Sequence, residues 1–230
     1  MQILLFLPAL FLFLYILYRL VKDDYIFIRK GISLEQSFDI AFITLWVSLF
    51  SSRLLFLLFH LYPGQNILFD FFSFNKGGFS LTGAIIGGMI VVYLTGRYKR
   101  VPLGRLSDFL SLSFSYALPL LFLSDAIFAK KSELLFVFLN AVVYFILLLF
   151  FVQFLYPKVM NRTIKEGLLS LVFLLAFSLI SLITSLLISL KHIQNFLNPE
   201  NIILTAIFLF SLFLFIKLER SSHTRRMIIK

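Results

Sequence analysis

Seven long apolar stretches follow one another along the chain, separated by short polar gaps. They run over Ile3–Val21, Phe38–Leu61, Phe79–Thr95, Leu106–Phe128, Leu134–Tyr156, Leu168–Leu190 and Ile202–Ile216. A helix rises about 1.5 Å per residue, so about 20 apolar residues cross the roughly 30 Å of hydrocarbon in a bilayer. The pattern therefore predicts an all-α, polytopic membrane protein, a bundle of seven transmembrane helices.

Prolines support these boundaries. Four of the six prolines fall in the gaps between stretches, where a helix has to stop, and Pro157 is the one that follows the fifth stretch. Pro8 and Pro119 lie inside stretches instead. They predict kinks that neighbouring helices can accommodate.

Composition excludes several classes of protein. Of 230 residues, 60% are hydrophobic and only 14% are charged. Ordinary soluble domains have about half apolar and a quarter charged residues, so a water-soluble globule is excluded. The absence of cysteine excludes disulfide scaffolds and thiol catalysis. The three histidines lie far apart in the sequence and show no metal-binding spacing, so we expect neither a metal site nor a cofactor.

Basic residues predict the orientation. Sixteen Lys and Arg residues fall in the gaps on one side of the predicted bundle, and four fall on the other. Because cytoplasmic loops carry the excess of basic residues, the N-terminus is predicted outside and the C-terminus in the cytoplasm. The first stretch lacks a basic start and a small-residue cleavage site, so it is interpreted as a retained helix. We expect residues 1–220 to form the transmembrane domain and 221–230 a basic cytoplasmic tail, with no role in nucleic-acid binding.

A ridge of small residues is predicted on the third apolar stretch. Seven of the ten glycines lie between residues 77 and 104. Gly83 and Gly87 are four positions apart, as are Ala84 and Gly88, so they share one helix face. Such a ridge allows another helix to approach closely. It can also form a wall against which a lipid headgroup or an extended peptide lies.

Arg53 is a cation inside the second apolar stretch. At the centre of a membrane such a residue costs about 2.5–3.5 kcal/mol. Its side chain either reaches the outer headgroups or faces the bundle interior, where a guanidinium can bind a phosphate through two hydrogen bonds. Asp125, predicted at a similar depth, can pair with it. His60, at the outer end of the same stretch, is a candidate base near neutral pH, although surface histidines are more common.

Four motifs occur in order between residues 32 and 118. They are Ser51-Ser52-Arg53-Leu54, then Gly77-Gly78-Phe79-Ser80-Leu81-Thr82-Gly83-Ala84-Ile85-Ile86-Gly87-Gly88, the basic segment Arg97–Arg105, and Ser107-Asp108-Phe109. This order and spacing resemble the bacterial prolipoprotein diacylglyceryl transferase family. That family shows Gly-Gly-Arg-Ile/Leu-Gly-Tyr, then Gly-Gly-x-x-x-His/Tyr-Gly-Gly-Leu-Ile-Gly, a basic loop and Asp-Phe.

The resemblance implies an enzyme of the bacterial plasma membrane. The family transfers a diacylglyceryl group from phosphatidylglycerol to the lipobox cysteine of secreted precursors, so the expected partners are that phospholipid and lipobox-bearing precursor proteins. It implies that Arg53 binds the phosphate and that Thr82 and Gly83 line the substrate site. Thr82 stands where the family has histidine or tyrosine.

The fourth stretch departs from the family pattern Gly-Arg-x-Gly-Asn-Phe-x-Asn-x-Glu. Phe122 stands at the arginine position, Asp125 at the first asparagine and Phe128 at the second. Asp125 remains a candidate binding residue. Lys130 and Lys131 follow in the next gap and are candidate replacement cations for the phosphate.

Three hypotheses follow from the sequence. The first is an active, divergent transferase that uses Arg53 and the two lysines. The second is a non-catalytic relative that binds lipid or lipoprotein precursor in the membrane. The third, an unrelated transporter or channel, is weaker, because no chain of paired ionisable residues and no inverted repeat is visible within the apolar stretches.

Overall fold

The protein is a bundle of helices, and the all-α prediction is confirmed. The computed structural model describes residues 2–60, 67–72, 78–99, 101–128, 131–189 and 198–228, and these residues contain no strand. The helices are α1 (Gln2–Lys22), α2 (Tyr25–Arg29), α3 (Leu34–Phe59), α4 (Ile67–Phe72), α5 (Leu81–Lys99), α6 (Leu103–Phe128), α7 (Lys131–Phe150), α8 (Tyr156–Met160), α9 (Leu168–Ser189) and α10 (Pro199–Ile228).

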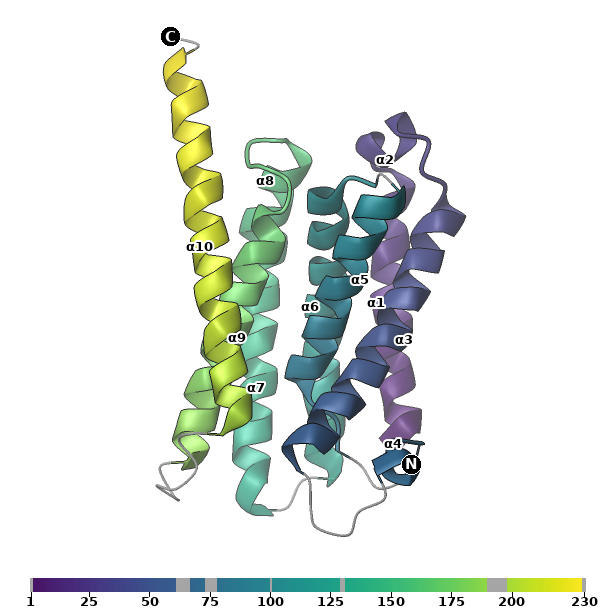
Figure 1. Ribbon diagram of the computed structural model, residues 1–230, viewed down its shortest axis with the longest axis vertical. Coiled ribbons are helices and arrows are strands. Elements are labelled where there is room, and N and C mark those ends of the chain that lie inside the picture. Colours follow the sequence, from purple (N-terminus) through teal and green to yellow (C-terminus); the bar gives the residue numbers. More distant parts are fainter. Residues whose placement is uncertain are drawn as a thin grey trace.

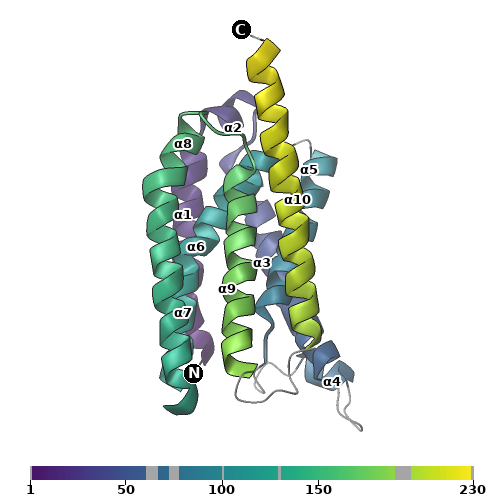
Figure 2. The same cartoon turned by 90° about the vertical axis from the view of Figure 1, so that its left-hand side faces the viewer.

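The long helices run side by side along the longest axis of the molecule (Figure 1). Helices α2 and α8 lie at one end, called here the α2 end, and α4 lies at the other, the α4 end, where α5 and α10 begin (Figures 1 and 2). Within the described residues, six helices are long and apolar enough to cross a membrane. They are Leu34–Phe59, Leu81–Lys99, Leu103–Ile127, Leu134–Met160, Leu168–Leu187 and Pro199–Glu219.

Helix α1 is 21 residues long and occupies the place of the first predicted span, but it is not one of these six. It starts at the α4 end and packs along α6. The last helix, α10, ends at the α2 end, so the chain begins and finishes at opposite ends of the bundle (Figure 1). Seven membrane crossings and the sides on which the termini face stay predictions.

Helix α6 lies at the centre of the bundle. Over its candidate span 56% of the residues are buried, against 17% for α3 and for α10. It packs against α1, α7 and α9, and it supplies Phe109 and Leu118, which are almost wholly inaccessible. The outer helices expose large apolar side chains such as Trp46 and Phe213. This distribution suits a bundle whose outer surface faces lipid rather than water.

Helix α7 does not end at the predicted gap. A π-helical segment, Phe151–Leu155, follows it directly, and α8 carries the helical path through Pro157 to Met160. Proline lacks an N–H group and its ring crowds the carbonyl four residues earlier. A wider π-helical turn just before Pro157 accommodates both effects. The prediction that Pro157 lies in a gap was therefore wrong.

Helices α3 and α5 pack closely because α5 presents glycine to its partner. A Cβ atom added to Gly83 would lie 2.7 Å from the carbonyl oxygen of Ser51, and one added to Gly87 would lie 2.9 Å from that of Val47. Real side chains essentially never approach backbone that closely. The small-residue ridge therefore faces α3, as the helix-packing interpretation predicts.

Candidate functional site

Arg53 is buried at the α4 end, with only 2% of its surface exposed. Its Nη1 donates to the carbonyl oxygen of Gly78 over 2.7 Å, and its Nη2 to that of Asp70 over 2.8 Å. The guanidinium carbon lies 5.6 Å from the ring centre of Phe79 and 5.9 Å from that of Phe56. Arg53 therefore ties α4 and the segment before α5 to α3. Its side chain is thus held inside the protein and does not extend toward the lipid headgroups.

Ser80 joins three helices beside this arginine. Its backbone N–H donates to the carbonyl of Ser52 in α3 over 3.2 Å. Its Oγ accepts from the N–H of Gly83 over 3.3 Å, as an N-cap residue does. The same hydroxyl donates to Oε1 of Glu200 over 2.7 Å, which connects the starts of α5 and α10.

A cavity of about 370 Å³ opens next to this junction. Segments from five helices line it. Its lining residues are Phe79, Ser80, Leu81 and Thr82 around the start of α5, Phe122 of α6, Asn140 and Tyr144 of α7, Phe177, Ser181, Thr184 and Ser185 of α9, and Asn198, Glu200, Asn201 and Leu204 around the start of α10. The cavity is thus amphipathic, with aromatic rings, neutral hydrogen-bonding groups and one carboxylate.

Polar and aromatic contacts fix the wall formed by α6, α7 and α9. Thr184 donates to Oδ1 of Asn140 over 2.9 Å, and the hydroxyls of Tyr144 and Ser181 lie 3.4 Å apart. The Phe122 ring stacks on that of Tyr144, with centroids 5.1 Å apart and planes inclined by 7°. Phe122, expected from the resemblance at the family's arginine position, is therefore an apolar part of the cavity wall.

The structure brings together only some of the predicted site residues. Thr82 lines the cavity, whereas Gly83 faces α3. Asp125 is exposed on α6, and among the described residues no ion pair joins it to Arg53. His60 is exposed at the end of α3, where its ring stacks on Phe56 with centroids 4.3 Å apart.

Only one of the two predicted replacement lysines lies in the described part of the chain. Lys130 lies outside the described residues, and Lys131 is the first residue of α7, with a side chain that is not described. The part of the chain that the structure describes holds no group of three or more His, Asp or Glu side chains arranged to bind a metal ion. The phosphate-binding roles of Lys130 and Lys131 stay predictions.

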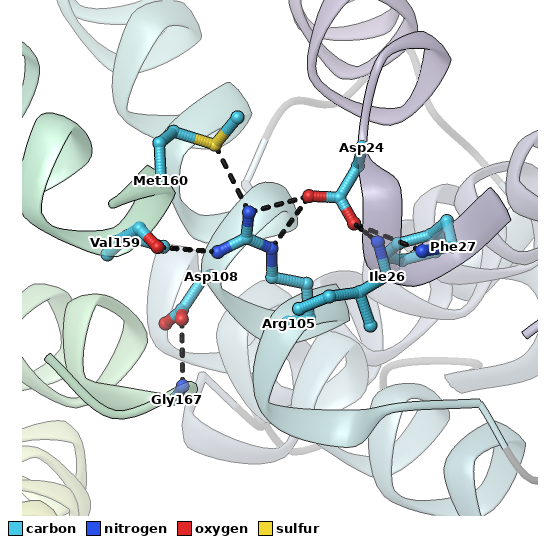
Figure 3. A network of polar contacts seen from close by, with 8 residues as sticks. All are labelled: Asp24, Ile26, Phe27, Arg105, Asp108, Val159, Met160 and Gly167. Carbon is cyan, nitrogen blue, oxygen red and sulfur yellow. Dashed lines mark hydrogen bonds and ion pairs between the residues drawn. The ribbon is translucent and has the colours of Figure 1, made fainter. Parts of the chain in front are cut away.

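A second polar cluster lies at the α2 end (Figure 3). Arg105 is 3% exposed and donates from Nε and Nη2 to Oδ2 of Asp24, over 2.9 and 2.6 Å. Its Nη1 donates to the carbonyl of Val159 over 2.9 Å, and Nη2 also contacts the sulfur of Met160 at 3.2 Å. The guanidinium lies 4.9 Å from the ring centre of Phe109. One arginine of α6 thereby binds the connection between α1 and α2 and the end of α8.

Both carboxylates of this cluster also cap helices. Oδ1 of Asp24 accepts from the backbone N–H groups of Ile26 and Phe27, so Asp24 is the N-cap of α2. Asp108 of α6 reaches the start of α9, where its oxygens accept from the N–H groups of Gly167 over 2.7 Å and Ser170 over 2.8 Å. Each carboxylate satisfies donors that a helix start leaves without partners.

Sequence reasoning missed most of this cluster. Arg105 was counted as a loop cation that sets the orientation, yet it is buried in an ion pair. The sequence made Asp108 a plausible cap or interfacial anchor near the inner end of its helix, without naming the α9 amides that it caps. The available signal was local: Asp24 precedes a short apolar segment as an N-cap does, and Arg105 and Asp108 are one helical turn apart on α6.

Comparison with known proteins identifies the family. The model of the prolipoprotein diacylglyceryl transferase family matches residues 3–121, just over half of the chain. The chain belongs to this family. The matched part contains Arg53, the glycine-rich start of α5 and the charged residues Asp24, Arg105 and Asp108. Most of the cavity wall, including Asn140, Thr184 and Glu200, lies beyond it.

Curated relatives agree with this assignment over a shorter region. Proteins from two strains of Clostridium kluyveri, both named phosphatidylglycerol–prolipoprotein diacylglyceryl transferase, are 29% identical to the chain over 79 residues. The alignment covers 34% of this chain and 31% of each relative, so the chain matches about a third of their length. No solved structure matches the chain. The protein is thus a multi-pass membrane protein of this transferase family.

Proposed function

We propose that this protein transfers a diacylglyceryl group from phosphatidylglycerol to the cysteine of a lipobox-bearing precursor, within the cavity at the α4 end. One observation carries the proposal: the amphipathic cavity directly adjoins the family-matched segment that Arg53 holds. Phe79 and Thr82 of that segment line the cavity, and Arg53 binds the neighbouring Gly78 carbonyl. An amphipathic space among apolar helices suits a ligand with a polar head and acyl chains.

The reaction sets clear requirements. The cysteine sulfur forms a bond to the terminal glyceryl carbon, the bond from that carbon to the phosphate oxygen breaks, and glycerol phosphate leaves with the electron pair. The thiol proton passes to a base, for which His60 is the proposed residue. Lys130 and Lys131 are proposed to neutralise the leaving phosphate, since cations aimed at developing charge lower the barrier. No cofactor is proposed.

The proposed setting is the bacterial plasma membrane, with the N-terminus outside and residues 221–230 as a cytoplasmic tail. In that orientation the α4 end is external, because α1 starts there (Figure 1). The cavity then lies in the outer half of the bilayer, beside the leaflet from which a lipid can enter sideways. Residues 1–220 constitute the proposed transmembrane domain.

A direct assay tests the proposal. Membranes containing the full chain are mixed with phosphatidylglycerol and a lipobox peptide, and the thioether-linked diacylglyceryl peptide is sought by mass spectrometry. Product that is lost in Arg53→Ala but retained in Glu35→Gln, an exposed carboxylate at the far end of the bundle, supports the enzyme. Absence of product from folded wild-type protein overturns it.

A non-catalytic relative that binds lipid or precursor is the second candidate. Two observations favour it. The described lining of the cavity contains no lysine or arginine, and Phe122 occupies its wall in a flat stack on Tyr144. Loss of one preorganised charge donor commonly costs a factor of about 10²–10³ in rate. If the assay gives no product while lipid stays bound through purification, this second function is supported.

A further inference from the structure

Glu200 is an acidic side chain that a hydrogen bond holds at the cavity wall. Its Oε1 accepts from the hydroxyl of Ser80 over 2.7 Å. Ser80 is itself fixed, because its N–H donates to the carbonyl of Ser52 and its Oγ accepts from the N–H of Gly83. Within the described part of the chain, no second hydrogen bond reaches the Glu200 carboxylate. Its other oxygen, Oε2, is therefore an acceptor held beside the cavity.

The cavity lining changes character with distance from the α4 end. Glu200 lies in the first turn of α10, which begins at that end (Figure 2). Helix α7 starts at the same end and α9 finishes there (Figures 1 and 2). Tyr144 of α7 and Phe177 of α9 lie about three helical turns further into the bundle. The cavity thus has a polar part near the α4 end and an aromatic part nearer the middle of the bundle.

A glycerophospholipid has the same order of polarity, from its head group through the phosphate to the acyl chains. In the proposed orientation the α4 end is external, so an outer-leaflet lipid would place its head group near Glu200 and its acyl chains toward Tyr144 and Phe177. A carboxylate repels an anionic phosphate but accepts hydrogen bonds from hydroxyl groups. The uncharged end of the head group, rather than the phosphate, therefore suits the position beside Glu200.

The amides around Glu200 supply hydrogen-bond donors. Thr184 donates to Oδ1 of Asn140 over 2.9 Å, so the amide N–H groups of Asn140 are the part of that side chain suited to a ligand. Asn198 and Asn201 flank Glu200 at the start of α10 and also line the cavity. A hydroxyl group both donates and accepts hydrogen bonds. A head group that carries several hydroxyls therefore matches a wall made of one carboxylate and several amides.

We propose that Glu200 is a specificity-determining residue for the lipid donor, and that its carboxylate accepts hydrogen bonds from the hydroxyls of the terminal glycerol of phosphatidylglycerol. This inference rests on the proposed function, which assigns phosphatidylglycerol to this cavity. It adds the residue that distinguishes this head group from others of equal charge. The terminal glycerol belongs to the departing glycerol phosphate and lies across the phosphate from the bond that breaks. Glu200 lies beyond residues 3–121, so the family match does not supply this role.

A matched pair of lipids tests the proposal. Phosphatidylpropanol has the charge and the three-carbon head group of phosphatidylglycerol but lacks the head-group hydroxyls. Delipidated full chain in detergent is titrated with both lipids, carrying identical acyl chains, and bound lipid is counted by native mass spectrometry. We expect the wild type to bind phosphatidylglycerol about fivefold more tightly, which corresponds to one net hydrogen bond.

Glu200→Gln is the decisive variant. Glutamine keeps the size of the side chain and an acceptor for Ser80, but it replaces Oε2 by an amide that cannot accept. The preference for phosphatidylglycerol should therefore fall to about twofold or less, because the charged acceptor is gone. Glu35→Gln removes an exposed carboxylate at the α2 end and should keep the preference of the wild type.

The ratio of the two affinities separates recognition from a structural effect. A disturbed cavity would weaken both lipids alike, and simple removal of a negative charge would strengthen both. An unchanged ratio in Glu200→Gln, or the same loss of preference in Glu35→Gln, therefore overturns the proposal. Equal binding of the two lipids to the wild type also overturns it, but leaves the proposed function intact. Failure of folded wild-type protein to bind either lipid overturns the assignment of lipid to this cavity, and with it the proposed function.

Discussion

Arg105 and Asp24 form a buried ion pair across 81 positions of sequence, with 2.6 Å between Nη2 and Oδ2. The pair joins the central helix α6 to the turn between α1 and α2, and Asp24 is at the same time the N-cap of α2. Asp24 therefore both pairs with the cation of α6 and caps the start of α2. Removing one partner leaves the other as a buried charge, which proteins tolerate poorly.

Substitution of Arg105 by methionine is predicted to destabilise the protein strongly. The single variant leaves the Asp24 carboxylate without its cation, and breaking such a pair typically costs about 3–5 kcal/mol. The double variant Arg105→Met with Asp24→Asn should be less destabilised than the sum of the two single variants, because no buried charge remains. Thermal unfolding of detergent-solubilised protein measures this. Additive effects of the two substitutions would contradict the account.

Asp108 is predicted to hold the start of α9. Asparagine at this position keeps one oxygen acceptor but replaces the other by an amide that cannot accept from a backbone N–H. One of the bonds to Gly167 and Ser170 is then lost, at a cost of about 1–3 kcal/mol. Hydrogen exchange should quicken at whichever of these two amides loses its acceptor, while the amide of Gly83 at the other end of the bundle exchanges as before. Unchanged exchange at both Gly167 and Ser170 would show that Asp108 does not cap α9.

Gly83 is predicted to be needed for the contact between α3 and α5. Alanine there would place its Cβ 2.7 Å from a backbone carbonyl, so the helices have to separate, which we expect to cost about 1–3 kcal/mol. Gly88→Ala is the matched control, because its Cβ would first meet the movable hydroxyl of Ser48 at 3.3 Å. That variant should be neutral or stabilised by up to about 1 kcal/mol, since alanine favours helix. Equal unfolding temperatures for Gly83→Ala and Gly88→Ala would show that Gly83 is not specifically needed for the contact between α3 and α5.

The helices were predictable because membrane spans depend on length and apolarity alone. The second to seventh apolar stretches each overlap one of the six described spans, with ends that differ by a few residues. Pro157 was placed wrongly because a π-helical turn is a tertiary accommodation that composition does not reveal. The burial of Arg105 was missed for a related reason: the rule of basic cytoplasmic loops treats every cation near a helix end alike.

The cavity could not be predicted from the sequence. Asn140, Thr184 and Glu200 are single polar residues on three helices, and none belongs to a local motif. Only the packing of α7, α9 and α10 brings them together. Arg53 was predictable as an unusual residue, because a cation in an apolar stretch needs a partner. Its partners, the carbonyls of Gly78 and Asp70, were not, since any residue could have offered them.

Arg53 is predicted to act by geometry rather than by charge alone. Its planar guanidinium reaches two carbonyls of separate segments, which a lysine ammonium on a different stem cannot reproduce. Arg53→Lys should therefore loosen the segment before α5, so that the amides of Ser80 and Gly83 exchange about tenfold faster with solvent deuterium. The amide of Ser170, held by Asp108, is the internal control. Lipid retention then distinguishes two roles of Arg53. If Arg53→Lys retains lipid as the wild type does while Arg53→Met loses it, the positive charge binds the lipid directly. Equal loss of lipid in both variants shows instead that Arg53 positions the cavity wall.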